Sequence, residues 1–366
     1  MFMDERLWRI AAGLCLAVGM ALAPAVVQAQ QPQSPLKLPK TVEQAFETSK
    51  AATTDAQFTT VITLCRRGLE LKLDARQAAY TRRLLAWAYN QRGEVRADAG
   101  DEQKALADFE QSLATLPGWR ATHNRGVSYA ACGKLDEALA DFDQVIRSKQ
   151  DFAPVWYNRA ELRSQQGSYQ AAIDDYRQAL HLRPNDPAAL AGRGYALYQL
   201  GKYEPAIADL CRSLELEPKQ AATLVYRAAA YYETGRYGQA ADDCRSAVRL
   251  DPNSPAAYQA TGWLLATCPD ERFRDAKLAV KAAQKAIELR GHKTYRDLET
   301  LAAALASDGQ FQLAANTQRQ AIAALPPHLA ELSAEFKDRL KRYEHHQAYL
   351  ETRVARTSSP RSTMAR

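Results

Sequence analysis

Arginine and aspartate recur at a fixed spacing through the middle of the chain. Five arginines follow one another at a nearly constant interval, and an aspartate stands at the same distance after each of them. The arginines are Arg92, Arg125, Arg159, Arg193 and Arg227, and the aspartates are Asp108, Asp141, Asp175, Asp209 and Asp243. A row of guanidinium groups could bind an anionic ligand, but a carboxylate beside each arginine would cancel its charge. We therefore predict internal Arg–Asp pairs, within a repeat or across a junction, that select the register of the helices more than they add stability.

No pattern in the sequence predicts catalysis, a metal site or a cofactor site. The chain contains no G-x-S-x-G, no H-E-x-x-H, no phosphate-binding loop and no C-x-x-C. His345 and His346 are adjacent, but neighbouring side chains on a helix point about 100° apart, which disfavours a shared metal. The G-x-G at residues 192–194 lies inside a helical pattern with no strand before it. We predict a protein that is not an enzyme and holds no cofactor.

The spacing of the arginines is also the spacing of the glycines. Gly133, Gly167, Gly201 and Gly235 are equally spaced, which indicates a chain built from repeats. Before and after each glycine, apolar residues recur at i, i+3, i+4 and i+7, as in an amphipathic helix. We therefore expect an all-α protein in which each repeat has two antiparallel helices, helix A before the glycine and helix B after it.

Small residues recur at two places in each repeat. With the turn glycine numbered as position 15, position 8 is Gly or Ala and position 20 is always Ala, as in Gly194 and Ala206. Two helices approach closely only where both lack bulk, so these positions mark the crossing of helix A on helix B.

Residues 153–186 resemble the tetratricopeptide repeat. They match its small residues at positions 8, 20 and 27, its bulky residue near position 24 and its proline at position 32. The matching residues are Ala160, Ala172, Ala179, Tyr176 and Pro184. The resemblance implies a right-handed α-solenoid whose A helices line a concave inner face, and a role in binding a protein or peptide.

The repeat pattern divides the chain into segments. A degenerate N-terminal repeat with a helix extension covers 42–85. The repeats that follow cover 86–118, 119–152, 153–186, 187–220, 221–254, 255–294 and 295–328. In 255–294 a longer connection replaces the turn glycine. A charged helix, 329–352, is expected to cap the last repeat, because the open end of a solenoid would expose apolar surface.

The resemblance places positions 2, 5, 9, 12 and 13 of helix A on the inner face. Tyrosine and tryptophan occur there in the central repeats, and both offer large rigid contact surfaces with a polar tip. We predict a peptide-binding groove in which these rings contact the ligand and three amides bond to its backbone. Its residues are Tyr157, Asn158, Tyr195, Tyr198, Gln199, Tyr232, Gln259 and Trp263. For each ring, packing between neighbouring helices is an equally open alternative.

The family's carboxylate clamp is not expected in this groove. That clamp needs basic residues at several inner-face positions, where this chain has Tyr157, Glu161, Tyr195 and Ala229. A chaperone C-terminal tail is therefore not the expected ligand.

The cysteines predict buried thiols. Cys65, Cys132, Cys244 and Cys268 stand at positions where such repeats place core residues. Cys211 and Cys244 would lie on neighbouring B helices, and whether they pair stays open.

The segment 1–29 predicts a targeting signal. Arg6 and Arg9 precede an apolar run over 10–27, and small residues at 27–29 offer a cleavage site. We expect export to the periplasm or the cell exterior, with membrane anchoring by an uncleaved 10–27 as the alternative.

The chain carries only a weak positive charge apart from its C-terminus. Of a net charge of +6, the segment 351–366 contributes +3. Residues 30–41 indicate a Pro/Gln-rich spacer, and 353–366 a disordered basic tail. We expect no nucleic acid partner and no contact with a membrane except through the N-terminus.

The function that fits these features is a non-enzymatic scaffold that binds a protein or peptide and assists the assembly of an envelope or secreted complex. Two alternatives stay open. The chain could be the regulatory or substrate-recruiting subunit of an enzyme, or it could bind nucleic acid or polysaccharide.

Overall fold

The structure is a computed structural model that describes residues 37–351. The predicted targeting segment 1–29, most of the spacer 30–41 and the tail 353–366 lie outside the described residues.

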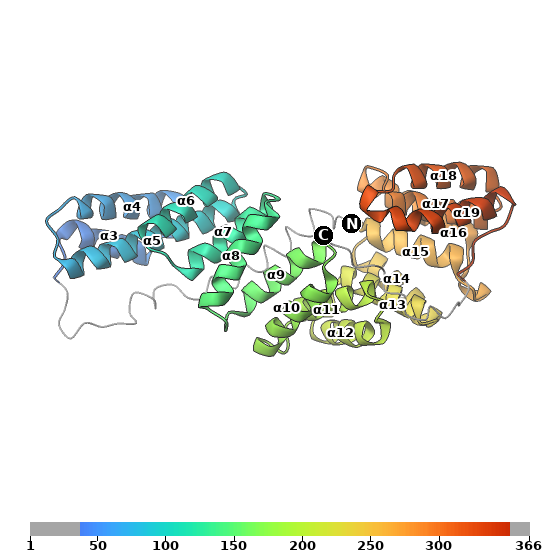
Figure 1. Ribbon diagram of the computed structural model, residues 1–366, viewed down its shortest axis with the longest axis horizontal. Coiled ribbons are helices and arrows are strands. Elements are labelled where there is room, and N and C mark those ends of the chain that lie inside the picture. The colour runs from blue at the N-terminus through green and yellow to red at the C-terminus, as the bar shows by residue number, and fades with distance from the viewer. Residues whose placement is uncertain (1–36, 352–366) are drawn as a thin grey trace. The chain divides into compact units, whose positions relative to one another are not determined.

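The described residues form an all-α protein, as predicted (Figure 1). Residues 37–351 contain seventeen α-helices, α3 to α19, two short 3-10 helices and no strand. The chain divides into two compact units, Met1–Arg183 and Pro184–Arg366. In each unit consecutive helices pair as helix A and helix B of one repeat.

The first unit contains four such pairs in its described part. Its helices are α3 (Lys40–Lys50), α4 (Asp55–Leu69), α5 (Ala75–Asp98), α6 (Glu102–Thr115), α7 (Trp119–Ala131), α8 (Leu135–Ser148), α9 (Ala153–Gln165) and α10 (Tyr169–Leu182). The long helix α5 includes the extension that the sequence predicts before the repeat 86–118.

The second unit contains four further pairs and a C-terminal helix. Its helices are α11 (Pro187–Gln199), α12 (Tyr203–Leu216), α13 (Ala221–Glu233), α14 (Tyr237–Leu250), α15 (Pro255–Thr267), η2 (Glu271–Phe273), α16 (Ala276–Arg290), α17 (Tyr295–Ser307), α18 (Phe311–Ala323), η3 (Pro327–Leu332) and α19 (Ser333–Glu344). The 3-10 helix η2 belongs to the longer connection that the sequence predicts in 255–294.

Local sequence sets where the helices begin and end. Gly133 has a φ of +73°, a left-handed conformation that glycine adopts without the steric cost of a Cβ atom, so the chain turns sharply from α7 into α8. Helix α11 begins with Pro187 directly after Asp186, whose carboxylate accepts hydrogen bonds from the N–H groups of Ala188 and Ala189 at 3.1 Å.

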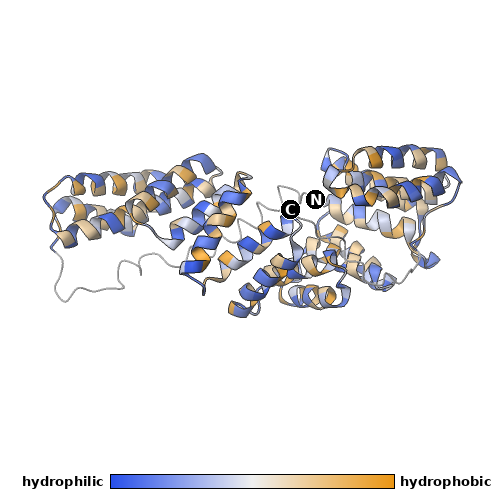
Figure 2. Cartoon of the chain, in the orientation of Figure 1, coloured by the Kyte–Doolittle hydropathy of each residue, from blue (hydrophilic) through white to orange (hydrophobic). Residues whose placement is uncertain are grey.

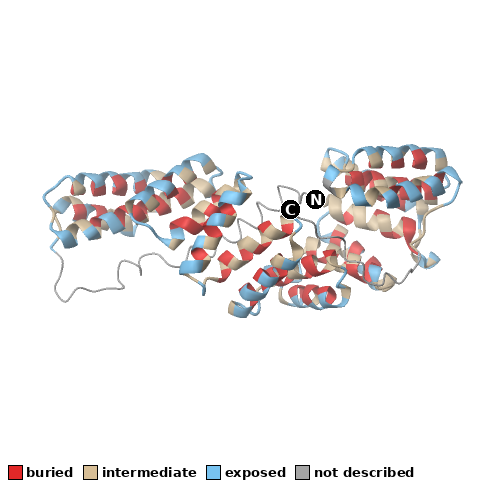
Figure 3. Cartoon of the chain, viewed as in Figure 1, coloured by how far each residue is buried: buried red, intermediate tan, exposed pale blue. Residues whose placement is uncertain are grey.

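Helix A and helix B cross where both lack bulk. A Cβ atom added to Gly194 would lie 2.7 Å from Leu210 Cγ and 3.2 Å from the carbonyl oxygen of Ala206. Ala206 itself is completely buried. Hydrophobic residues line one side of each helix (Figure 2), and the buried residues form stripes along the helices (Figure 3). The core is therefore a series of small clusters along the repeats.

The C-terminal helix is shorter than the sequence predicts. Helix α19 ends at Glu344, and residues 345–351 are not helical, although the predicted cap extends to residue 352. His346 adopts a φ of +59°, and the N–H of Gln347 donates to the carbonyl oxygen of Arg342 at 2.9 Å. This left-handed turn ends the helix and reverses the chain. The helix still covers the last repeat, because Phe336 and Tyr343 are buried.

The prediction that Cys132 is buried is wrong. Cys132 is exposed because it ends α7, directly before the turn at Gly133. Cys65, Cys244 and Cys268 are buried. Within residues 37–351, no helix has both the length and the apolar character needed to cross a membrane.

We expect Gly194→Ala to destabilise the second unit. Replacing a glycine inside a helix by alanine usually stabilises the protein by about 1 kcal/mol. At this crossing the added Cβ atom overpacks the core, which destabilises the protein by about 1–3 kcal/mol. Gly238→Ala is the matched control, because its added Cβ would have only an ordinary contact at 3.6 Å with Phe273. Thermal unfolding followed by circular dichroism measures both. Equal melting temperatures for the two variants would show that the crossing tolerates a wider separation.

Candidate functional site

Each arginine of the Arg–Asp ladder bonds to the aspartate of its own repeat. The Nε and Nη2 groups donate to the two carboxylate oxygens, at distances of 2.6 to 2.9 Å over the five pairs. The pairs are Arg92–Asp108, Arg125–Asp141, Arg159–Asp175, Arg193–Asp209 and Arg227–Asp243. All five aspartates are buried. Each pair therefore joins helix A to helix B with the planar two-bond geometry that arginine favours.

Three ladder arginines also reach the preceding repeat, the first of them Arg92, whose Nη1 donates to Thr59 Oγ1 at 2.8 Å. Nη1 of Arg159 donates to Asp143 at 2.5 Å, and Nη1 of Arg227 donates to Cys211 Sγ at 3.4 Å. The structure thus directs these donors at internal acceptors and not at a ligand. Cys211 and Cys244 are both thiols, with no disulfide between them.

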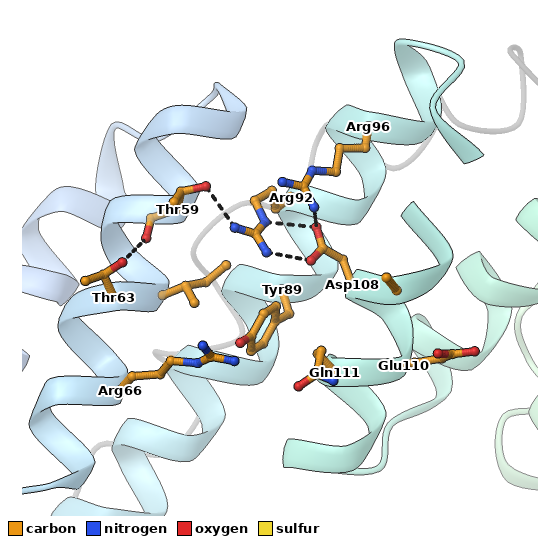
Figure 4. A pocket seen from close by; sticks show the side chains of 11 residues that line it. Thr59, Thr63, Arg66, Tyr89, Arg92, Arg96, Asp108, Glu110 and Gln111 are labelled. Carbon is orange, nitrogen blue, oxygen red and sulfur yellow. Dashed lines mark hydrogen bonds and ion pairs between the residues drawn. The ribbon is translucent and has the colours of Figure 1, made fainter. Parts of the chain in front are cut away.

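A cleft of about 380 Å³ lies between α4, α5 and α6 of the first unit (Figure 4). The guanidinium groups of Arg66 and Arg92 both lie against the ring of Tyr89, at 5.7 and 5.6 Å from its centre. Arg92 donates to Thr59 Oγ1 at 2.8 Å and shares the carboxylate of Asp108 with another arginine of α5. The cleft is polar, and none of the predicted groove residues lines it.

Asn158 lies between two A helices instead of facing a ligand. Its Nδ2 is 3.0 Å from Nε2 of His123 on α7, and Nδ1 of that ring is 3.2 Å from Oδ1 of Asn124. Asn124 in turn donates to Oδ1 of Asn90 at 3.1 Å. With the amides assigned in this way, Nε2 accepts and Nδ1 carries the hydrogen, so the imidazole is neutral. The polar chain joins α5, α7 and α9, which corrects the expectation that Asn158 bonds to a bound peptide.

Tyr157 and Tyr232 belong to the core, and their assignment to a groove is wrong. Tyr157 is 8% exposed, and its hydroxyl bonds to the half-buried Glu161. Burial raises the pKa of Glu161, while its hydrogen bonds to Tyr157 and Tyr176 lower it in part. Tyr232 is 7% exposed, and its hydroxyl lies 2.8 Å from Thr267 Oγ1, which links α13 to α15. Both rings fill space between helices, the alternative that the sequence left open.

The two glutamines of the predicted groove also face inward. Gln199 is buried at the end of α11. Gln259 donates from Nε2 to Thr300 Oγ1 at 3.2 Å and so connects α15 with α17. The Gln259 amide therefore serves a contact between helices, and burial removes Gln199 from the predicted groove surface.

Tyr195 and Tyr198 are partly exposed on α11. Tyr195 packs on Tyr226 of α13 with ring centres 4.6 Å apart. Arg296 of α17 interacts with both tyrosines of α11: burial alone would lower its pKa, but its tyrosine neighbours raise it. We call Tyr195, Tyr198, Tyr226, Trp263 and Arg296, which come from the four A helices of the second unit, the aromatic face.

Trp263 is covered by residues 345–351, which we call the strap. Tyr349 of the strap lies with its ring centre 6.1 Å from that of Trp263. The guanidinium of Arg339 on α19 lies 4.8 Å from the Tyr349 ring centre and 5.5 Å from that of Trp263. The N–H of Glu351 donates to the carbonyl oxygen of Thr267 at 3.0 Å. The strap therefore runs from α19 back to the C-terminal end of α15.

A buried ion pair holds Arg339 in this position. Its Nη1 bonds to Glu299 of α17, and Nη2 is 3.7 Å from Glu335. Burial raises the pKa of Glu299 to about 6, although the charges of Arg339 and Arg296 oppose the shift. The carboxylate of Glu299 thus orients the guanidinium that contacts the strap.

Sequence reasoning missed several residues of the aromatic face and its cover. Arg296 could have been found, because it stands at position 2 of its repeat, one of the inner-face positions. Tyr349 and Glu351 gave no such indication, because the sequence places them in the capping helix. Among residues 37–351, no group of three or more His, Cys, Asp or Glu side chains could hold a metal ion.

Comparisons with known proteins agree with this architecture. Models of the TPR repeat match residues 162–201, and models of the tetratricopeptide repeat match 90–154 and 192–255. The chain is a tetratricopeptide repeat protein. No curated protein matches this sequence.

Solved structures share the fold of this tetratricopeptide repeat protein. A tetratricopeptide repeat protein from Parabacteroides merdae is 19% identical, with a TM-score of 0.54 over 71% of this chain and 98% of that one. A chain of the APC/C hetero-tetramer Cut9–Hcn1 is 16% identical, with a TM-score of 0.53 over 72% of this chain and 54% of that one.

We expect Asp175→Ala to destabilise the first unit far more than Asp174→Ala. The Asp175 carboxylate is 3% exposed and bonds to Arg159 and Arg163, whereas the Asp174 carboxylate is 54% exposed. Breaking a buried pair costs about 3–5 kcal/mol, and losing an exposed pair costs below about 1 kcal/mol. Urea unfolding of both variants measures the difference. A loss below about 1 kcal/mol for Asp175→Ala would contradict the structural role of the ladder.

The first unit should lose stability as pH falls from 6.5 to 4. Burial lowers the pKa of His123 to about 4, against about 6.5 in an unfolded chain. As the pH falls, His123 is therefore protonated in the unfolded state before it is protonated in the folded state. At pH 4.5 this lowers the free energy of unfolding by about 2–3 kcal/mol. His123→Gln stays neutral at every pH and should remove this part of the dependence, as unfolding at pH 7.0 and 4.5 would measure. An unchanged slope in His123→Gln would exclude His123 as its source.

Proposed function

We propose that this protein is a non-enzymatic interaction scaffold that binds an extended peptide segment of a partner on the aromatic face of the second unit. The tetratricopeptide repeat fold supports an interaction role, because its helices build a surface and the described residues contain no catalytic constellation. The finer proposal, a role in assembling an envelope or secreted complex, rests on the targeting pattern in the segment 1–29.

The observation that carries the proposal is a set of large rings that the core does not fully bury. Tyr195, Tyr198 and Trp263 are partly exposed on A helices. Such rings dominate the binding energy of many interfaces, because they bury large areas with few rotatable bonds. Arg296 adds a cation among them, which can attract an acidic or aromatic group of the ligand.

The aromatic face favours a peptide over nucleic acid. A nucleic acid partner needs a row of available cations, whereas the ladder arginines are bonded to buried aspartates. A regulatory or recruiting role within an enzyme complex would use the same surface, and a catalytic chain that copurifies with the protein would support it.

We also propose export of the mature chain. Arg6 and Arg9 before the apolar run 10–27 support this, and N-terminal sequencing of the native protein tests it. A cytoplasmic chain that still begins at Met1 would contradict it.

Alanine substitutions on the aromatic face should weaken peptide binding without unfolding the protein. Peptides selected from a displayed library on the full chain provide the ligand, and isothermal titration measures their Kd. We expect Tyr195→Ala or Tyr198→Ala to cost about 2 kcal/mol, or roughly 30-fold in Kd. Tyr129→Ala, which removes a partly exposed ring of the first unit, should leave the Kd unchanged. A large drop in melting temperature with unchanged Kd would assign these rings to the core instead.

A further inference from the structure

The strap contacts the second unit as a bound peptide would. Helix α19 packs through Phe336 and Tyr343, which are buried, but residues 345–347 are exposed and residues 348–351 are only partly buried. The strap continues this cover, because His346 stacks on Phe311 of α18 and Tyr349 packs against the core cluster of the last repeat. It also adds contacts to α15, beyond the last repeat.

One of these contacts uses the backbone. The carbonyl oxygen of Thr267 stands in the last turn of α15, where carbonyl groups have no partner within the helix. The N–H of Glu351 supplies that partner at 3.0 Å. Any extended chain can offer the same N–H unless the residue is proline, so this contact selects an extended backbone and not a particular side chain.

A second contact uses the ring of Tyr349. The ring lies beside Trp263 and under the guanidinium of Arg339, an arrangement that combines aromatic packing with a cation–π interaction. The Tyr349 hydroxyl also bonds to Arg339 and to the carboxylate of Glu351. The bond to Glu351 lies within the strap itself, so the face recognises the ring and hydroxyl of a tyrosine.

These contacts identify an occupant and its chemistry. We propose that the strap is a resident ligand of the aromatic face, and that a partner binds by replacing it with an extended segment that carries tyrosine and, two residues later, any residue with a backbone N–H. This inference rests on the proposed function, because it specifies the ligand of the same face. It also makes binding a competition within one molecule.

The tether sets the strength of this competition. A segment joined to its site by a short link has an effective concentration in the millimolar range. If the strap binds its own site with a dissociation constant near 100 μM, it lowers the apparent affinity of a competing segment by roughly 10-fold. The intact chain is thus expected to bind only partners whose segments make more contacts than the strap does, for example with Tyr195 and Tyr198.

A synthetic peptide with the sequence of residues 345–351, labelled with fluorescein at its N-terminus, tests the proposal. Fluorescence anisotropy measures its binding to the full chain and to full-chain variants. Tyr349→Ala removes the ring of the strap and should bind the peptide at least 10-fold more tightly than the intact chain. Gln347→Ala changes an exposed strap residue and should behave as the intact chain. Adding Trp263→Ala to Tyr349→Ala should abolish binding.

A second pair of variants tests the backbone contact in case Tyr349→Ala disturbs folding. Glu351→Pro removes the N–H that bonds to Thr267, whereas Glu351→Gln keeps it. We expect tighter peptide binding for Glu351→Pro than for Glu351→Gln, with both melting temperatures close to that of the intact chain. A labelled peptide in which Ala replaces the tyrosine should bind none of these chains.

The outcomes separate this proposal from the proposed function. Equal affinity of the peptide for the intact chain and both strap variants would overturn the resident-ligand proposal. The proposed function would then still stand if library peptides bind and depend on Tyr195 or Tyr198. If no peptide binds any variant, both proposals are wrong. A concentration-dependent dimer of the intact chain that Tyr349→Ala dissolves, seen by size-exclusion chromatography with light scattering, would assign the strap to a second copy and overturn the competition.

Discussion

The close crossing of helix A on helix B is the constraint on which the other features depend. At Gly194 the neighbouring helix comes so near that a Cβ atom would meet a backbone carbonyl. At this separation the arginine at position 7, next to the crossing, reaches the aspartate of the facing helix with two hydrogen bonds. The same geometry recurs in five repeats, because each has small residues at the crossing and the same Arg–Asp pair beside it.

The crossing also determines which side chains are available for binding. The ladder pairs five arginines with buried aspartates. The large side chains Tyr157 and Tyr232 are buried in the core. Polar side chains of the first unit bond laterally between A helices, from Asn90 to Asn158. In the second unit, the partly exposed rings of the aromatic face lie near Arg296, and the strap covers the ring of Trp263.

The regular part of the fold could be predicted from the sequence because its causes are local and repeated. Glycine at the turn, small residues at the crossing and apolar periodicity place the helices within a few residues of where the structure has them. The partners of the ladder follow from the same register. The prediction of the groove was weaker, because a position number shows which way a residue points but not how far the next helix covers it. Both Tyr195 and Tyr232 stand at inner-face positions, but the neighbouring helices bury Tyr232 and leave Tyr195 partly exposed.

The strap could not be predicted because its cause is a single backbone conformation. The charged sequence after Pro327 has a helical pattern up to Leu350, and nothing in it indicates that His346 adopts a left-handed turn. The contacts of Tyr349 and Glu351 then depend on Arg339, in the preceding helix, and on Thr267, two repeats earlier in the sequence. Long-range contacts of this kind need the packed structure.

Each of the five ladder aspartates is paired with the ladder arginine of its own repeat, which has a consequence for how such a chain can change over generations. A duplication or loss of the segment 187–220 would add or remove Arg193 together with Asp209, and so would leave no buried charge without its counterion. The hydrogen bond between His123 and Asn158 crosses a repeat boundary, so a recombination event between α7 and α9 would separate its two partners. Exchange of whole repeats therefore leaves the ladder charges paired in the second unit. At the junction of α7 and α9 in the first unit, such an exchange would break a hydrogen bond.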